Sequence, residues 1–99
     1  MAVKVFIKRK FKDENLKIAA RLLINHRNGA MAQPGYISSE TLQRLEDPSQ
    51  ITVVSMWKDI EAWEAWKNSE MRLGYENEAK DLLVGQTEYE HYSLGLPFE

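Results

Sequence analysis

The stretch ITVVSMWKDIEAWEAWKNSEMRLGYE, residues 51–76, decides the fold because an apolar strand-like run passes almost directly into an amphipathic helix. The run ends at Trp57, and Asp59 is placed to cap the helix, since its carboxylate accepts from the unpaired N–H groups of the first turn. Trp63 and Trp66 share one arc of the helical wheel and face the same interior surface. So much aromatic area predicts either a heavy core or the wall of a pocket for a flat ligand.

The sequence before this stretch predicts a strand, a helix and a second strand. Residues 3–11 alternate apolar and basic side chains, which is the two-residue period of a strand with one solvated face. An apolar stripe then predicts a helix from residue 12, and Gly29 is expected to end it, as glycine does at helix C-termini. A Pro-Gly pair turns the chain into a strand over residues 36–45.

The sequence after Trp66 predicts a continuation of the helix and a last strand. Ser69 is expected to cap the continuation, and Met71 and Tyr75 are expected on its inward face. Gly85 is expected to end the helix, and residues 87–94 are expected to form the strand. The order β-α-β-β-α-β with right-handed crossovers predicts an α+β fold of the ferredoxin-like, split βαβ type, with a four-stranded antiparallel sheet and helices on one face.

Composition narrows the class of protein. The 99 residues predict a single domain spanning residues 1–99, and the formal charge of −2 gives no field that attracts nucleic acid. There is no cysteine, which excludes disulfides and thiolate metal sites and fits a reducing cytoplasm. The two histidines stand apart in sequence, so no metal site is expected. No apolar run approaches membrane-spanning length, so no membrane association is expected.

The strands carry apolar residues at both odd and even positions, and this pattern predicts a homodimer. Phe6 lies beside Val5, and Val54 lies beside Val53, so both faces of the sheet are partly apolar. Helices cover only one face of this fold, and an apolar uncovered face needs a partner. We therefore expect two copies to pair through the open face of the sheet.

These patterns together resemble a known family. A strand of about ten residues, a helix, PGY opening the next strand, and V-x-x-W followed by the EAWEAW-x-x-S-x-M helix resemble the antibiotic biosynthesis monooxygenase family of dimeric α+β barrels, over residues 2–94. The resemblance implies a cofactor-independent monooxygenase acting on a small aromatic or quinol-like substrate. The alternative it leaves open is a catalytically silent dimeric module of the same fold that binds a small molecule or a partner.

The haem-degrading branch of that family is disfavoured by the same comparison. That branch uses an Asn in the first strand, a Trp, and a His about ten residues later as the iron ligand. Trp66 matches the Trp, but Ile7 stands at the Asn position and Glu76 at the His position. Without an imidazole there, nitrogen ligation of haem iron is lost.

The resemblance and the side-chain chemistry indicate two groups of site residues. Three are expected to take part in catalysis, namely Trp66, Tyr75 and Glu76, and five are expected to contact the substrate, namely Ile7, Arg9, Trp63, Met71 and His91. Arg9 shares the parity of the apolar side of its strand, so it either points inward and needs an anionic partner, such as Glu76 or the substrate, or reaches out to solvent.

Each candidate also has a purely structural interpretation. Trp63 and Trp66 can be core residues, since large aromatics at helical spacing usually pack. His26 is expected near the end of the first helix as a solvated cation that suits the dipole. His91 can be a structural or interface histidine. The basic run at residues 8–12 is expected to be a charged strand end that faces the acidic residues of the last strand.

Overall fold

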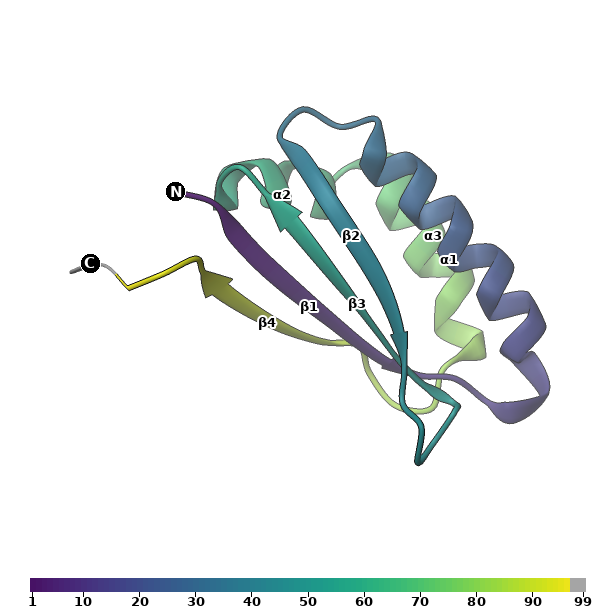
Figure 1. Cartoon of the computed structure of the whole chain (residues 1–99). Coiled ribbons are helices and arrows are strands. Elements are labelled where there is room, and N and C mark those ends of the chain that lie inside the picture. The colour runs from purple at the N-terminus through teal and green to yellow at the C-terminus, as the bar shows by residue number, and fades with distance from the viewer. Residues whose placement is uncertain (97–99) are drawn as a thin grey trace.

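The computed structural model describes residues 1–96 and contains a four-stranded antiparallel sheet with its helices on one face (Figure 1). The sheet order is β2-β3-β1-β4, which confirms the ferredoxin-like α+β arrangement. The strands are β1 (Val3–Lys10), β2 (Tyr36–Gln43), β3 (Gln50–Trp57) and β4 (Glu88–Ser93), the α-helices are α1 (Leu16–Met31), α2 (Ile60–Lys67) and α3 (Glu70–Ala79), and short 3-10 turns cover Asp13–Asn15 and Lys80–Leu82.

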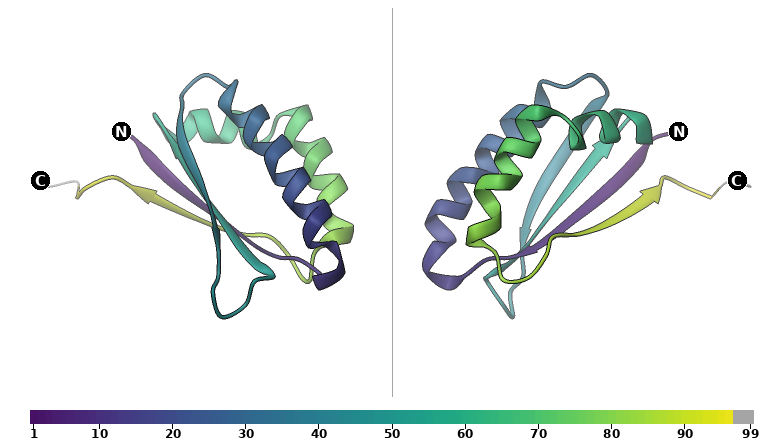
Figure 2. Two further views of the ribbon diagram at one scale, coloured as in Figure 1. Left: turned by 45° about the vertical axis from the view of Figure 1, so that its right-hand side comes forward. Right: turned by 180° about the vertical axis from the view of Figure 1, so that it is seen from behind.

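The register of the sheet decides which side chains face the helices. In β1, Val5 pairs with Ser55, Ile7 with Val53 and Arg9 with Ile51, and these side chains face the helical layer. Figure 2 shows α1 and α3 lying side by side over this face, while the opposite face has no helix. The predicted two-residue alternation of β1 therefore sorts its residues correctly between a covered and an uncovered face.

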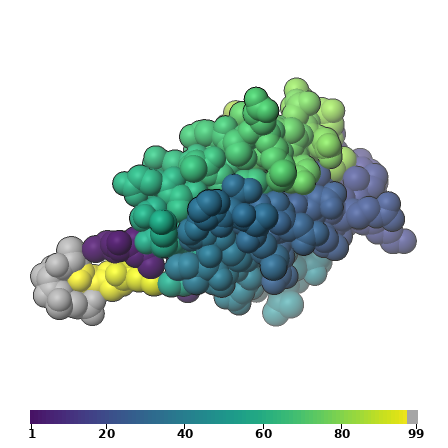
Figure 3. Space-filling view, turned by 90° about the horizontal axis from the view of Figure 1, so that it is seen from above, coloured from purple at the N-terminus to yellow at the C-terminus, as the bar shows by residue number. Residues whose placement is uncertain are grey.

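The uncovered face carries apolar side chains among charged ones. The rings of Phe6 and Tyr92 meet edge-on at 5.2 Å, and Lys8 Nζ lies 3.0 Å from a carboxylate oxygen of Glu90. The expected pairing of the basic strand end with β4 is therefore present. At the far end of the sheet, the backbone N–H of Leu94 donates to the carbonyl of Ala2, and Figure 3 shows these two chain ends side by side.

The starts of α2 and α3 agree with the sequence, but the end of α1 does not. Asp59 Oδ1 accepts from the N–H of Ala62 at 2.8 Å, and Ser69 Oγ accepts from the N–H of Arg72 at 3.2 Å, so both predicted caps are confirmed. Gly29 lies inside α1, which continues to Met31, so the prediction that Gly29 ends the helix was wrong.

Gly29 serves close packing between helices. A Cβ atom there would lie 2.6 Å from the Trp66 ring and 3.0 Å from the sulfur of Met71. The missing side chain lets the indole of α2 approach the backbone of α1, so the glycine reflects a tertiary contact instead of a local stop signal.

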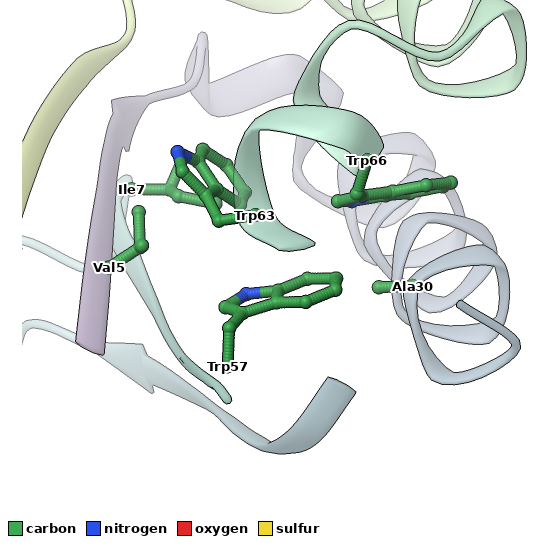
Figure 4. Close-up of a cluster of buried hydrophobic side chains, with 6 residues drawn as sticks. All are labelled: Val5, Ile7, Ala30, Trp57, Trp63 and Trp66. Atoms are coloured by element: carbon green, nitrogen blue, oxygen red, sulfur yellow. The ribbon is translucent and has the colours of Figure 1, made fainter. Parts of the chain in front are cut away.

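The core is built around the three indoles. Trp57, Trp63 and Trp66 pack with aliphatic residues of β1 and with Ala30 of α1, as Figure 4 shows. The rings of Trp57 and Trp63 lie 6.0 Å apart, and Trp57 Nε1 donates to Ser55 Oγ at 3.0 Å. A second buried cluster, made of Phe11, Ala19, Leu23 and Ile51, closes the other end of the sheet. Within residues 1–96, no helix is both long and apolar enough to cross a membrane.

Candidate functional site

A narrow internal cavity lies between the sheet and the helices. Its volume is about 40 Å³, enough for only a few waters, so a planar ligand must displace a wall side chain as it enters. The lining residues come from β1, β2, β3, α1, α2 and α3, and they are Ile7, Arg9, Leu23, His26, Arg27, Ala30, Tyr36, Ser39, Thr41, Val53, Ser55, Trp57, Trp63, Trp66 and Arg72.

Aromatic rings form much of the cavity wall. Trp57 comes from the end of β3, and Trp63 and Trp66 come from successive turns of α2, which the Asp59 cap sets directly after that strand. Figure 4 shows the three indoles between the β1 side chain of Ile7 and α1. The edge-on contact between Tyr36 and Trp57, at 5.6 Å, extends this wall to β2.

A buried cluster of two guanidiniums and one carboxylate lies at the cavity. Arg9 is only 3 % exposed and binds Glu76 through Nη2, so the inward alternative for Arg9, with Glu76 as its partner, is confirmed. Arg72 is also 3 % exposed, and its Nη2 lies 3.3 Å from the same oxygen, Oε1 of Glu76. Burial lowers the pKa of Arg9, and the charge of Glu76 opposes this shift. Arginine nevertheless keeps its charge at neutral pH.

Aromatic rings hold Arg72 in place. Its guanidinium carbon lies 5.1 Å from the ring centre of Trp63 and 5.5 Å from that of Tyr89, which is the geometry of cation–π contacts. Arg72 Nη2 also donates to the Tyr89 hydroxyl at 2.9 Å. The cation is therefore fixed in position before any ligand arrives.

His26 points into the protein and is held neutral. Its side chain is 11 % exposed, its ring stacks on Tyr75 at 5.0 Å, and its Nδ1 lies 3.7 Å from Glu76 Oε1. Burial is the main cause that lowers the pKa of His26 to about 4, and the charge of Arg9 adds to it. The expected solvated, charged cap was wrong, because α1 continues past Gly29 and His26 faces the cavity.

The structure brings together only some of the predicted site residues. Four of them line the cavity, namely Ile7, Arg9, Trp63 and Trp66. Tyr75 and Glu76 lie behind the lining, where they contact His26 and the two arginines.

Two predicted substrate contacts lie elsewhere. Met71 is 52 % exposed, and His91 is exposed with its ring 6.4 Å from that of Trp63, and neither side chain lines the cavity. The inward face of α3 includes Ala79 and Tyr75 as expected, but Arg72 is buried in place of Met71. The (i, i+4) pair of Arg72 and Glu76 was the signal in the sequence for this face. Within residues 1–96, no group of three or more histidine or acidic side chains is arranged to hold a metal ion.

This geometry defines the class of protein. It is a small α+β domain with an aromatic cavity between its sheet and its helices. The sequence profile described as Antibiotic biosynthesis monooxygenase matches residues 2–77. The chain therefore belongs to the antibiotic biosynthesis monooxygenase family, and the resemblance seen in the sequence is confirmed. No curated protein matches the chain in sequence.

Solved structures share the fold at low sequence identity. A conserved protein from Methanosarcina mazei Go1 is 23 % identical, with 93 % of this chain and 91 % of that chain covered and a TM-score of 0.87. Rv0793 from Mycobacterium tuberculosis is 14 % identical, with 94 % of each chain covered and a TM-score of 0.85. SnoaB, a cofactor-independent oxygenase from Streptomyces nogalater, is 12 % identical, with 96 % and 94 % covered and a TM-score of 0.83. At these identities the likeness establishes the fold and not the substrate.

Proposed function

We propose that this protein is a cofactor-independent monooxygenase that oxidises a small aromatic or quinol-like molecule in the cavity between sheet and helices. The observation that carries the proposal is the combination, in a family fold shared with an oxygenase of that kind, of an indole-walled cavity with buried guanidiniums. The absence of cysteine suits a reducing cytoplasm as the place where it acts.

The reaction needs no bound redox group when the substrate supplies the electrons. An anthrone-type methylene, after losing a proton, reacts with O₂ so that one oxygen atom becomes the new carbonyl and the other leaves as water with both hydrogens of the methylene. The protein must hold the electron-rich anion in a dry site and stabilise its charge. The buried cavity, with Arg9 and Arg72 in its lining, suits both tasks.

Each predicted catalytic residue has a proposed task. Trp66 holds the flat substrate as part of the wall, while Glu76 orients Arg9 and Arg72 from behind it. Tyr75 stacks on His26 and fixes this neutral imidazole beside the two arginines. Glu76 and Tyr75 are thus proposed as positioning residues.

Oxygen uptake tests the proposed function. With dihydroxynaphthalenes and anthrones as a panel, we expect uptake that depends on the protein and a fall of about tenfold in kcat/KM in Trp66→Phe, because the smaller ring contacts the substrate less. Leu73→Val, an exposed change on α3, is the control and should keep the wild-type rate. No protein-dependent uptake with any member of the panel would contradict an oxygenase.

A catalytically silent binding module is the second candidate. The observation that favours it is the small volume of the cavity, about 40 Å³. Binding of aromatic ligands without any oxygen uptake would establish this alternative. Haem degradation is disfavoured, since Glu76 stands where that branch has its histidine and already binds two arginines.

We also propose that the protein is a homodimer paired through the uncovered face of the sheet. That face exposes Phe6, Leu42 and Tyr92 in part, and burying such apolar area stabilises association. The melting temperature should therefore fall on dilution, while sedimentation at higher concentration should give twice the monomer mass of 11.5 kDa. A melting temperature independent of concentration, together with a monomer mass, would contradict the dimer.

A further inference from the structure

We infer that the cavity selects a planar aromatic anion, with its charge on a phenolate or carboxylate oxygen, and that Arg9 and Arg72 bind this oxygen. The inference rests on the proposed function only in taking the cavity as the substrate site. It adds a charge requirement that an aromatic wall alone does not impose.

The first argument is the unequal number of buried charges. Among the described residues, no carboxylate lines the cavity, whereas the buried Arg9 and Arg72 and the exposed Arg27 do. Behind the lining, Glu76 supplies one negative charge, and its Oε1 is shared between Arg9 and Arg72. His26 is close to the same oxygen but neutral. The buried cluster thus carries one positive charge in excess, and an unbalanced charge in a poorly solvated site is unfavourable until an anion joins it.

The second argument is the set of donors left without acceptors. Arg9 Nε and Trp63 Nε1 are buried N–H groups without a hydrogen-bond partner. Both side chains line the cavity. Buried donors are normally paired, so these two N–H groups suit a ligand rich in acceptors. An oxygen anion can accept several hydrogen bonds at once, and bonds of this kind are stronger than neutral ones.

The third argument is pre-organisation. Arg72 is already fixed by Trp63, Tyr89 and Glu76, so little side-chain freedom is lost when a ligand binds. The same indole that supports the cation also faces the cavity, which places a flat ring and an anionic oxygen in adjacent positions. An aromatic anion satisfies both features with one molecule.

Calorimetric titration with 2-naphthoate and its neutral isostere 2-naphthamide tests the inference at pH 7.5. Wild type should bind naphthoate at least about tenfold more tightly, and Arg72→Met should abolish this preference. Glu76→Gln should bind naphthoate at least about threefold more tightly than wild type, because it removes the negative charge that competes for both arginines. Arg44→Met, an exposed change outside the cavity, is the matched control and should bind like wild type.

The ligand pair and the variants together distinguish failure of the anion site from failure of the oxygenase proposal. If Arg72→Met does not fold, as circular dichroism will show, Glu76→Gln and the ligand pair on wild type still decide the question. Equal binding of the two naphthalenes, or weaker naphthoate binding by Glu76→Gln, would overturn the inference, and so would no binding of either. Naphthoate preference without oxygen uptake from any aromatic would support the anion site while the oxygenase proposal fails. Oxygen uptake without anion preference would support the oxygenase proposal while the anion site fails.

Discussion

Glu76→Leu is expected to lower the free energy of unfolding by about 3–5 kcal/mol, because two buried guanidiniums would lose the carboxylate they share. The side chains of Arg9 and Arg72 are only 2 % and 4 % exposed, and that of Glu76 is 20 % exposed. Water therefore cannot take over the role of the carboxylate. Since small domains are stable by roughly 5–15 kcal/mol, this loss should be plain in urea denaturation at pH 7.5.

Two comparison variants show whether the loss comes from the buried charge. Glu46→Leu removes an exposed carboxylate 3.5 Å from Arg44 Nε and should cost less than about 1 kcal/mol. The double variant Arg9→Met/Glu76→Leu should recover part of the stability, because one unpaired cation is removed as well. A cost for Glu76→Leu no larger than that for Glu46→Leu would mean that solvent screens the cluster.

The fold could be predicted from the sequence because its signals are local. The two-residue alternation of β1, the apolar run of β3 and the caps at Asp59 and Ser69 each fix an element without knowledge of the rest of the chain. Once these elements are in order, the handedness of their connections leaves few arrangements. The ferredoxin-like arrangement followed from that argument, and the observed sheet order β2-β3-β1-β4 belongs to it.

The predictions of the end of α1 and of a solvated His26 were wrong because a contact distant in sequence outweighs the local signal. Asn28 and Gly29 have the composition of a helix end, yet α1 continues because Gly29 gives space to the Trp66 ring. That extension turns His26 from a terminal position into an interior one. A single sequence gives no sign that an indole from another helix lies against this glycine.

Of the two buried arginines of the site, only Arg9 was predicted from the sequence. Its parity on β1 placed it inward, and burial then required an anionic partner, which the structure shows to be Glu76. Arg72 was missed because an apolar stripe containing Met71 fits the helical period equally well. The two stripes differ by one residue, and only the contacts of Arg72 with Trp63 and Tyr89 decide between them.

The buried histidine should make the stability of the protein depend on pH. The pKa of His26 is about 4 in the folded protein, against an ordinary value of 6.5 that applies when the chain is unfolded. Above pH 6.5 neither state is protonated, and the histidine contributes no pH dependence. As the pH falls from 6.5 towards 4, the unfolded chain binds a proton that the folded protein does not bind, so stability is lost. The loss attributable to His26 should reach about 3 kcal/mol near pH 4.

His26→Gln should remove this loss, because glutamine does not titrate. Urea denaturation at several pH values between 7.5 and 4.5 measures the difference in unfolding free energy between wild type and variant, which cancels the contribution of the carboxylates. His26→Gln will be less stable than wild type at pH 7.5, since the stack on Tyr75 is lost, but its stability should fall less steeply. His91→Gln changes the exposed histidine and should keep the wild-type slope. Equal slopes for wild type and His26→Gln would show that His26 takes up its proton in the folded protein, and that the site beside Arg9 and Glu76 is open to water.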